Sequence, residues 1–167
     1  MSPLSSLFVV IFFIITLFTI SSFSDDDLFS DLISLRSKSE SGVIRLNDQL
    51  LSRFHTSSKS PRGFSLLIFF DAVQLHNKTE LNLRGLRNEF GLLASSFITN
   101  NKESLSSRST IFFCDMEFSE SQSSFKKFGV KSVPHIRLVP STAVSLKEDS
   151  IQMDADDSSR LAESMAV

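Results

Sequence analysis

The sequence predicts an α/β domain in which helices cover both faces of a central sheet. Residues 64–70 (FSLLIFF) form a near-continuous apolar run, which is typical of a strand buried on both faces. Residues 80–98 repeat apolar side chains at intervals of three and four, as one face of a helix does. The repeat consists of Leu83, Leu86, Phe90, Leu93 and Phe97. Because strand-like and helix-like segments alternate along the chain, we expect a mixed sheet that is parallel in part.

Three shorter elements are predicted before the central strand. Acidic residues followed by apolar residues at helical spacing predict a leader helix within residues 25–41, which Gly42 ends. The β-branched run 43–46 (VIRL) favours a strand. Asn47 is then a good N-cap for a helix that continues through Phe54.

After the long helix, the same patterns predict the second half of the domain. The expected elements are a strand at 109–115 (STIFFCD), a helix at 119–128, a strand at 135–139, an edge strand at 141–145 and a last helix from 156 to 165. Val133-Pro134 is expected to turn the chain into the strand at 135–139. The order therefore ends in a hairpin and a helix.

Size and charge limit the function classes. A chain of 167 residues is long enough for one domain with a real core and too short for two of ordinary size. Its 17 basic and 19 acidic side chains give a formal net charge of -2. Because no excess of cations is present to neutralise phosphates, nucleic acid is not an expected partner.

The N-terminal segment predicts entry into the secretory pathway. Residues 7–20 (LFVVIFFIITLFTI) have the length of a signal-peptide core and are shorter than a typical bilayer span. Small residues at Ser22 and Ser24 predict a signal peptide of residues 1–24, cleaved after Ser24. The segment before the apolar run has no Lys or Arg, so an uncleaved membrane anchor is the alternative.

Only one cysteine is present, so an internal disulfide is excluded. Cys114 follows the apolar run Ile111-Phe112-Phe113, which predicts a buried and inert thiol.

Several segments together resemble a known family. VIRLNDQLLSRF, SLLIFFDA, STIFFCDMEF and FKKFGVKSVPHIRLV resemble a thioredoxin fold in order and length, over residues 42–167. More narrowly, IFFDAVQLHNKTELN, EFGLLASSF and FGVKSVPHIRL resemble the luminal thioredoxin-like domain of the oligosaccharyltransferase complex subunit 3/6 family, as found in plants. Family members continue into membrane spans after this domain. The resemblance therefore implies that the last helix, which stops at Val167, is truncated.

This resemblance implies a non-catalytic accessory subunit in protein N-glycosylation, located in the endoplasmic reticulum. Its partners would be the other oligosaccharyltransferase subunits and nascent polypeptide, held transiently and without a cofactor. Membrane contact would come only through the complex or through an uncleaved signal segment. The alternative is a free luminal peptide-binding or chaperone-like domain outside the complex.

A thiol oxidoreductase is the third hypothesis, and the sequence does not favour it. Redox-active members of both families open the helix after the central strand with Cys-x-x-Cys, whereas residues 74–82 here read QLHNKTELN. Disulfide exchange needs an attacking thiolate and a resolving thiol, and neither is present there. Phe69 also stands where thioredoxins bury an acid.

The resemblance also implies a peptide-binding site. Val133-Pro134 resembles the pair that in thioredoxins carries a cis peptide bond, beside which Val133 would offer backbone groups to an extended peptide. The residues that would line the groove with this pair are Phe70, Asp71, Gln74 and Thr79. The alternative for the pair is an ordinary trans turn before a strand.

Two other patterns could carry chemistry. His55, His76 and His135 are scattered without a ligand spacing, so no metal site is expected. Asn77-Lys78-Thr79 is the only N-glycosylation sequon of the chain, and a luminal location would make it usable. A glycan there would hinder peptide docking. Asp71, at the end of a strand, is expected to accept hydrogen bonds in a turn rather than to act as a catalytic acid.

Overall fold

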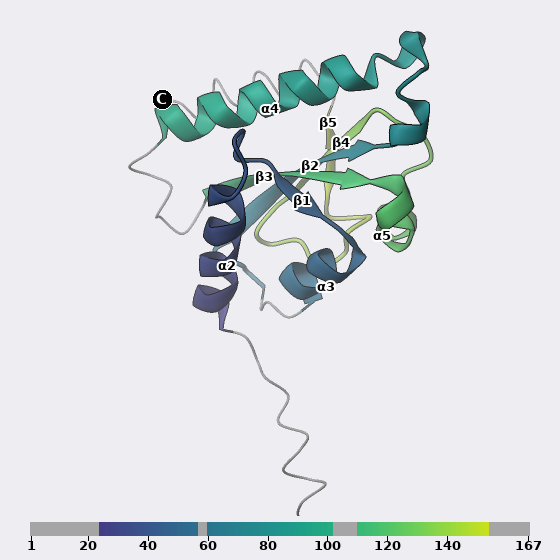
Figure 1. The fold of residues 1–167 in the computed structure, drawn as a ribbon. Helices are drawn as coiled ribbons and strands as arrows, with labels where there is room; N and C mark the ends of the chain where they lie inside the picture. The colour runs from purple at the N-terminus through teal and green to yellow at the C-terminus, as the bar shows by residue number, and fades with distance from the viewer. Residues whose placement is uncertain (1–23, 57–59, 102–109, 154–167) are drawn as a thin grey trace, which may run out of the picture.

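A five-stranded mixed sheet forms the centre of the molecule in the computed structural model, which describes residues 24–56, 60–101 and 110–153 (Figure 1). The strands are β1 (Ile44–Leu46), β2 (Phe64–Asp71), β3 (Thr110–Glu117), β4 (His135–Val139) and β5 (Ile151–Met153). Their order in the sheet is β1-β3-β2-β4-β5. β1, β3 and β2 are parallel, whereas β4 and β5 pair antiparallel. The predicted mixed sheet is therefore confirmed.

Helices cover both faces of the sheet, as the buried central strand predicted. The helices are α2 (Asp25–Ser37), α3 (Asp48–Thr56), α4 (Leu83–Asn100) and α5 (Gln122–Phe128). Residues of α2, α3 and α5 share one core with the sheet, whereas α4 packs on the other face. Short 3-10 turns, η1 (Val73–Leu75), η2 (Thr79–Leu81) and η4 (Phe118–Glu120), follow the central strands.

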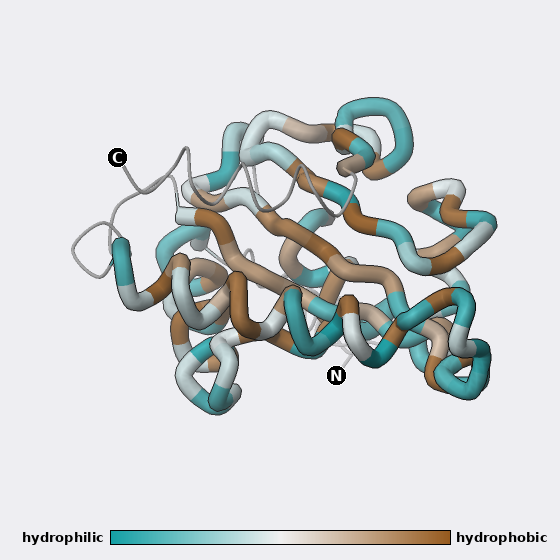
Figure 2. Tube along the Cα trace, turned by 90° about the horizontal axis from the view of Figure 1, so that it is seen from above, coloured by the Kyte–Doolittle hydropathy of each residue, from teal (hydrophilic) through white to brown (hydrophobic). Residues whose placement is uncertain are grey.

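The alternation of side chains along β2 explains why two cores exist. Leu66, Ile68 and Phe70 point into the core with α2, α3 and α5. Leu67 and Phe69 point into the core with α4. Successive side chains of a strand face opposite sides of the sheet, so an all-apolar strand needs cover on both. Figure 2 shows the hydrophobic residues gathered along the middle of the molecule and the hydrophilic ones in the peripheral loops.

The predicted leader helix belongs to the core of the domain. Leu28 and Leu32 of α2 are fully buried in it. Ser24 and Asp27 form a capping box at the start of α2, with the Ser24 hydroxyl accepting from the Asp27 backbone N–H. Cleavage after Ser24 would remove this cap, at a cost of about 1 kcal/mol. Residues 1–23 of the predicted signal peptide lie outside the described residues.

Gly42 is needed where the chain leaves α2 for β1. Its φ of 75° lies in the left-handed region, and an added Cβ would lie 2.2 Å from Cδ1 of Ile98 on α4. The sequence predicted that Gly42 ends the leader helix. The structure shows that the loop passes close to α4 at this residue.

The edge strand predicted at 141–145 is wrong, because β5 lies at Ile151–Met153. The intervening segment forms turns that the Asp149 carboxylate stabilises. It accepts hydrogen bonds from the backbone N–H groups of Val144 (2.9 Å) and Ser145 (2.7 Å). Satisfying these groups in a turn removes them from a strand ladder. The last predicted helix, from 156 to 165, lies outside the described residues.

Within the described residues, none of the helices combines the length and the apolar composition that crossing a membrane requires.

We expect Phe112→Ala to lower the free energy of unfolding by about 3 to 5 kcal/mol, because truncating a buried Phe loses apolar burial and leaves a cavity. Phe112 is fully buried, and its ring meets those of Phe29 and Phe64 edge-on at centroid distances of 5.6 and 6.1 Å. Urea unfolding measures the change. Leu92→Ala is the matched control, because Leu92 is 72% exposed on α4, and its effect should stay within about 0.5 kcal/mol.

Candidate functional site

A small cavity lies where the segments that follow β2, β3 and α5 meet. Its volume is about 180 Å³. The lining residues are Ala72, Gln74, Leu75, Phe118, Phe125, Val130, Lys131, Ser132 and Val133. They come from η1, η4, α5 and the loop that leads to β4. The carboxyl ends of neighbouring parallel strands emerge at one edge of a sheet, which is why these connections converge.

The loop before β4 has the expected conformation. The Val133–Pro134 peptide bond is cis, which confirms the geometry inferred from the resemblance and rules out the trans turn. Val133 lines the cavity, and Pro134 is exposed beside it. Gln74, on the opposite connection, also lines the cavity. Two distant segments that the sequence singled out therefore meet here.

Phe70 lies below the cavity and does not line it. Its side chain is fully buried, and its ring packs edge-on against Phe125 at 5.0 Å and Phe128 at 5.1 Å. The ring of His135 lies on another side at 5.8 Å. Since Phe125 is a lining residue, Phe70 supports the cavity from within the core.

Asp71 also lies away from the cavity, because it follows Phe70 on β2 and points to the opposite face of the sheet. Its carboxylate binds Nε2 of His76 at 2.8 and 3.0 Å and lies 3.9 Å from the guanidinium of Arg87 on α4. The same carboxylate accepts a hydrogen bond from the backbone N–H of Ala72 at 2.8 Å. Asp71 therefore accepts a backbone hydrogen bond where the chain leaves β2.

Thr79 and Asn77 lie on the exposed connection between η1 and α4. Both side chains are exposed, and Thr79 begins η2. Neither residue lines the cavity. Glycosylation of Asn77 stays a prediction.

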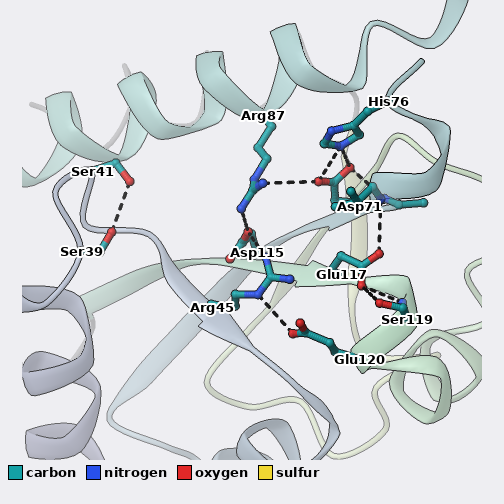
Figure 3. Close-up of polar contacts among 12 residues, drawn as sticks. Ser39, Ser41, Arg45, Asp71, His76, Arg87, Asp115, Glu117, Ser119 and Glu120 are labelled. Carbon is teal, nitrogen blue, oxygen red and sulfur yellow. Dashed lines mark hydrogen bonds and ion pairs between the residues drawn. The ribbon is translucent and has the colours of Figure 1, made fainter. Parts of the chain in front are cut away.

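A charged cluster that the sequence did not reveal joins the sheet to α4 (Figure 3). Arg87 bridges two carboxylates, with one nitrogen 2.6 Å from Asp115 and the other 3.9 Å from Asp71. On the other side, Arg45 contacts Asp115 at 3.4 Å and Glu120 at 3.2 Å. The side chains of Asp71 and Asp115 are almost fully buried, so these partners offset the cost of burying their charges.

Glu117, the last residue of β3, fixes two walls of the cavity. One carboxylate oxygen accepts from the Val73 backbone N–H of η1 at 3.3 Å. The other accepts from the Ser119 backbone N–H of η4 at 2.8 Å and from the Ser119 hydroxyl. Glu117 is 2% exposed. Burial raises its pKa, but the hydrogen bonds from Ser119, Val73 and Glu120 outweigh burial and hold the pKa below its usual value.

One pattern in the sequence could have identified Glu117. The strand predicted at 109–115 ends two residues before β3 does, because β3 continues to Glu117. The alternation of Asp115, Met116 and Glu117 after the apolar run continues a strand with period two. A longer strand would have placed Glu117 beside Asp71, which is its partner in the sheet register.

Cys114 is unsuited to exchange chemistry. It is a free thiol with 0% exposure in the middle of β3. Burial, assisted by the negative charge of Asp115, raises the pKa of the thiol well above its ordinary value. Because the thiolate is the reactive form, a buried thiol with a raised pKa is inert. The predicted buried thiol is confirmed.

The histidines are held in separate environments. His76 binds Asp71, whereas Nε2 of His135 accepts from Nε of Arg137 at 3.1 Å. His55 lies beside a different cavity. In residues 24–56, 60–101 and 110–153, no group of three His, Cys, Asp or Glu side chains is placed to hold a metal ion.

Comparison with known sequences assigns the family. Residues 30–167 match the family described as "OST3 / OST6 family, transporter family". The chain belongs to the OST3/OST6 family. It is 56% identical, over 139 residues, to a probable dolichyl-diphosphooligosaccharide--protein glycosyltransferase subunit 3B of Arabidopsis thaliana, which covers 83% of this chain and 40% of that protein. It is 48% identical to the subunit 3A of the same plant, over 95% of this chain and 45% of that protein.

This OST3/OST6 chain thus spans less than half the length of these relatives. The same holds for a probable dolichyl-diphosphooligosaccharide--protein glycosyltransferase subunit 3 of Oryza sativa subsp. japonica, which is 52% identical over 84% of this chain and 40% of that protein.

Solved structures show that this OST3/OST6 chain has a thioredoxin-like fold. The first thioredoxin domain of mouse protein disulfide-isomerase A4 superposes with a TM-score of 0.51, over 77% of this chain and 78% of that one, at 16% identity. Human ERp44 in a zinc-bound form gives a TM-score of 0.51 over 75% of this chain and 32% of that one, at 7% identity. The fold that the resemblance implied is confirmed.

We expect Glu117→Gln to destabilise the domain by about 1 to 2 kcal/mol at pH 7, because an amide accepts through one oxygen only and leaves a backbone donor unpaired. The folded-state pKa of Glu117 is lowered, so its carboxylate stabilises the domain above the unfolded-state pKa. This stabilisation is lost as the pH falls through the folded-state pKa.

Urea unfolding of both proteins from pH 7 to pH 3 measures the effect of Glu117→Gln. The difference in unfolding free energy should shrink toward zero at the acid end. Glu89→Gln, at an exposed position on α4, is the control and should change stability by less than about 0.5 kcal/mol. A difference that is equally large at pH 7 and pH 3 would contradict the role assigned to the Glu117 carboxylate.

Proposed function

We propose that this chain is the luminal part of a non-catalytic accessory subunit of the oligosaccharyltransferase complex in the endoplasmic reticulum. It transiently holds nascent polypeptide for protein N-glycosylation. Membership of the OST3/OST6 family and the names of the plant relatives support the place in the complex. The cavity beside Val133 and Pro134 supports the holding of peptide.

The size and lining of the cavity favour one apolar side chain of an extended peptide. Its volume of about 180 Å³ is below the range of about 300 to 1,000 Å³ that is usual for small-molecule sites. Phe118, at 39% exposure, and Phe125 form an edge-to-face pair at 5.2 Å in its wall. Exposed aromatic surface beside a hollow is typical of surfaces that bind a partner.

The backbone next to the cavity supplies a second component of binding. Val133 lies at its wall and Pro134 is exposed next to it, just before β4 begins at His135. A peptide in extended conformation would pair with the backbone of Val133 while one side chain enters the cavity. Recognition through backbone groups tolerates many sequences, as binding of diverse nascent chains requires. In this arrangement Gln74 contacts the peptide, whereas Phe70 and Asp71 position the cavity and Thr79 stays outside it.

Thiol chemistry is not part of this function. The connection after β2 carries Gln74 to Asn82 without a cysteine, and Cys114 lies buried in the neighbouring strand. Binding is therefore non-covalent and reversible. The second candidate, a free luminal peptide-binding domain, uses the same cavity without the complex.

Co-purification separates these two candidates. We expect the tagged chain, isolated from detergent-solubilised microsomes, to bring down the other oligosaccharyltransferase subunits. The same tagged chain without residues 1–24, which is not expected to enter the lumen, is the control and should not. Recovery of the luminal chain without other subunits would favour the free domain.

We expect Phe118→Asp to weaken binding of an extended synthetic peptide with one central leucine at least tenfold, or about 1.4 kcal/mol. The substitution places a charge in the apolar wall, where an occupied cavity would desolvate it. Fluorescence anisotropy of the labelled peptide measures the dissociation constant. Leu92→Asp introduces the same charge at an exposed apolar residue of α4 outside the cavity, and it should leave the constant unchanged. Equal effects of both substitutions would contradict binding at the cavity.

A further inference from the structure

The turn between η1 and η2 presents a complete N-glycosylation sequon on the surface. Asn77, Lys78 and Thr79 are all exposed. The central residue is not proline, and the third supplies the hydroxyl that the sequon requires. None of the three lines the cavity of the proposed peptide site. The sequon is therefore separate from the lining of that cavity.

The fold fixes this turn so that Asn77 points away from the core. The preceding residue, His76, has a side chain only 9% exposed because its imidazole binds the buried carboxylate of Asp71 (Figure 3). Anchoring His76 inward leaves the next side chain at the apex of the turn. Within the described part of the chain, the Asn77 side chain makes no hydrogen bond that a modification would break.

Two backbone hydrogen bonds fix the chain around Asn77, one that spans it and one that follows it. The Lys78 N–H donates to the Leu75 carbonyl at 3.0 Å, and the Asn82 N–H donates to the Thr79 carbonyl at 3.2 Å. Neither bond uses the side chain of the sequon asparagine. A large group attached to that side chain is therefore compatible with the folded domain, since it extends into solvent and displaces no packed residue.

We propose that Asn77 carries one N-linked oligosaccharide, so that this chain is itself a substrate of the type of reaction its relatives are named for. This inference rests on the luminal location in the proposed function. In the transfer, the Asn77 amide nitrogen forms a bond to C1 of the sugar of a lipid-linked diphospho-oligosaccharide. The bond from C1 to the donor phosphate oxygen breaks, the lipid diphosphate leaves, and the amide nitrogen loses one proton.

Substitutions within the sequon separate the glycan from any structural effect of the turn. Asn77→Gln and Thr79→Ala both destroy the acceptor motif, one at the acceptor and one two residues away. Thr79→Ser keeps the hydroxyl and therefore the motif. Asn88→Gln removes another exposed asparagine, on α4, that is not in a sequon. If Asn77 carries the glycan, Asn77→Gln and Thr79→Ala lose it. Thr79→Ser and Asn88→Gln retain it.

The experiment is translation of the full chain, with residues 1–24 included, in the presence of endoplasmic reticulum microsomes. Protease protection of the product reports entry into the lumen. We expect the protected wild-type, Thr79→Ser and Asn88→Gln chains to show one upward mobility step that peptide N-glycosidase removes. This step should be absent from Asn77→Gln and Thr79→Ala. A protected but unmodified wild-type chain would overturn the glycan alone, whereas an unprotected chain would overturn both the glycan and the luminal location.

Discussion

The parallel pairing of β2 with β3 is the constraint on which the rest of the structure depends. The two strands run side by side over eight residues, from Phe64 opposite Thr110 to Asp71 opposite Glu117. Nearly every side chain on both strands is buried, so helices must cover each face of this pair of strands. The cover on one face is α4, and on the other it is α2, α3 and α5. Burial of apolar area on two faces stabilises the sheet. The cavity lies at the ends of the strands.

At the carboxyl ends of this ribbon, apolar side chains give way to acids, and each acid organises a neighbouring segment. Asp71 and Asp115 attract Arg87 and so hold α4 against the sheet. Glu117 accepts from the turns that follow both strands and thereby sets the distance between two walls of the cavity. Buried carboxylates of this kind often indicate catalysis. Here each one has cationic or hydrogen-bonding partners that explain its position.

The cavity and the cis proline loop are present although the chain has no dithiol. In the thioredoxin-like fold the loop before β4 meets the connection after β2, and this meeting depends on the sheet order and not on cysteines. This framework can therefore form without a dithiol, and it carries the reversible binding of peptide that we propose for this chain. The buried Cys114, with its raised pKa, contributes packing to this framework.

The sequence by itself determined the layers of the fold, because burial on both faces leaves a continuous apolar run and a helix leaves a repeat of three and four. It also singled out Val133 and Gln74, which line the same cavity in the structure, since the resemblance rests on local segments. Tertiary structure decided which side of the sheet each polar residue takes, and Asp71 lies with α4 because side chains alternate on β2. It also decided the place of β5, the partners of Arg87 and the hydrogen bonds by which Glu117 joins two turns. These features join residues far apart in the chain, and contacts of that kind leave no periodic pattern in a single sequence.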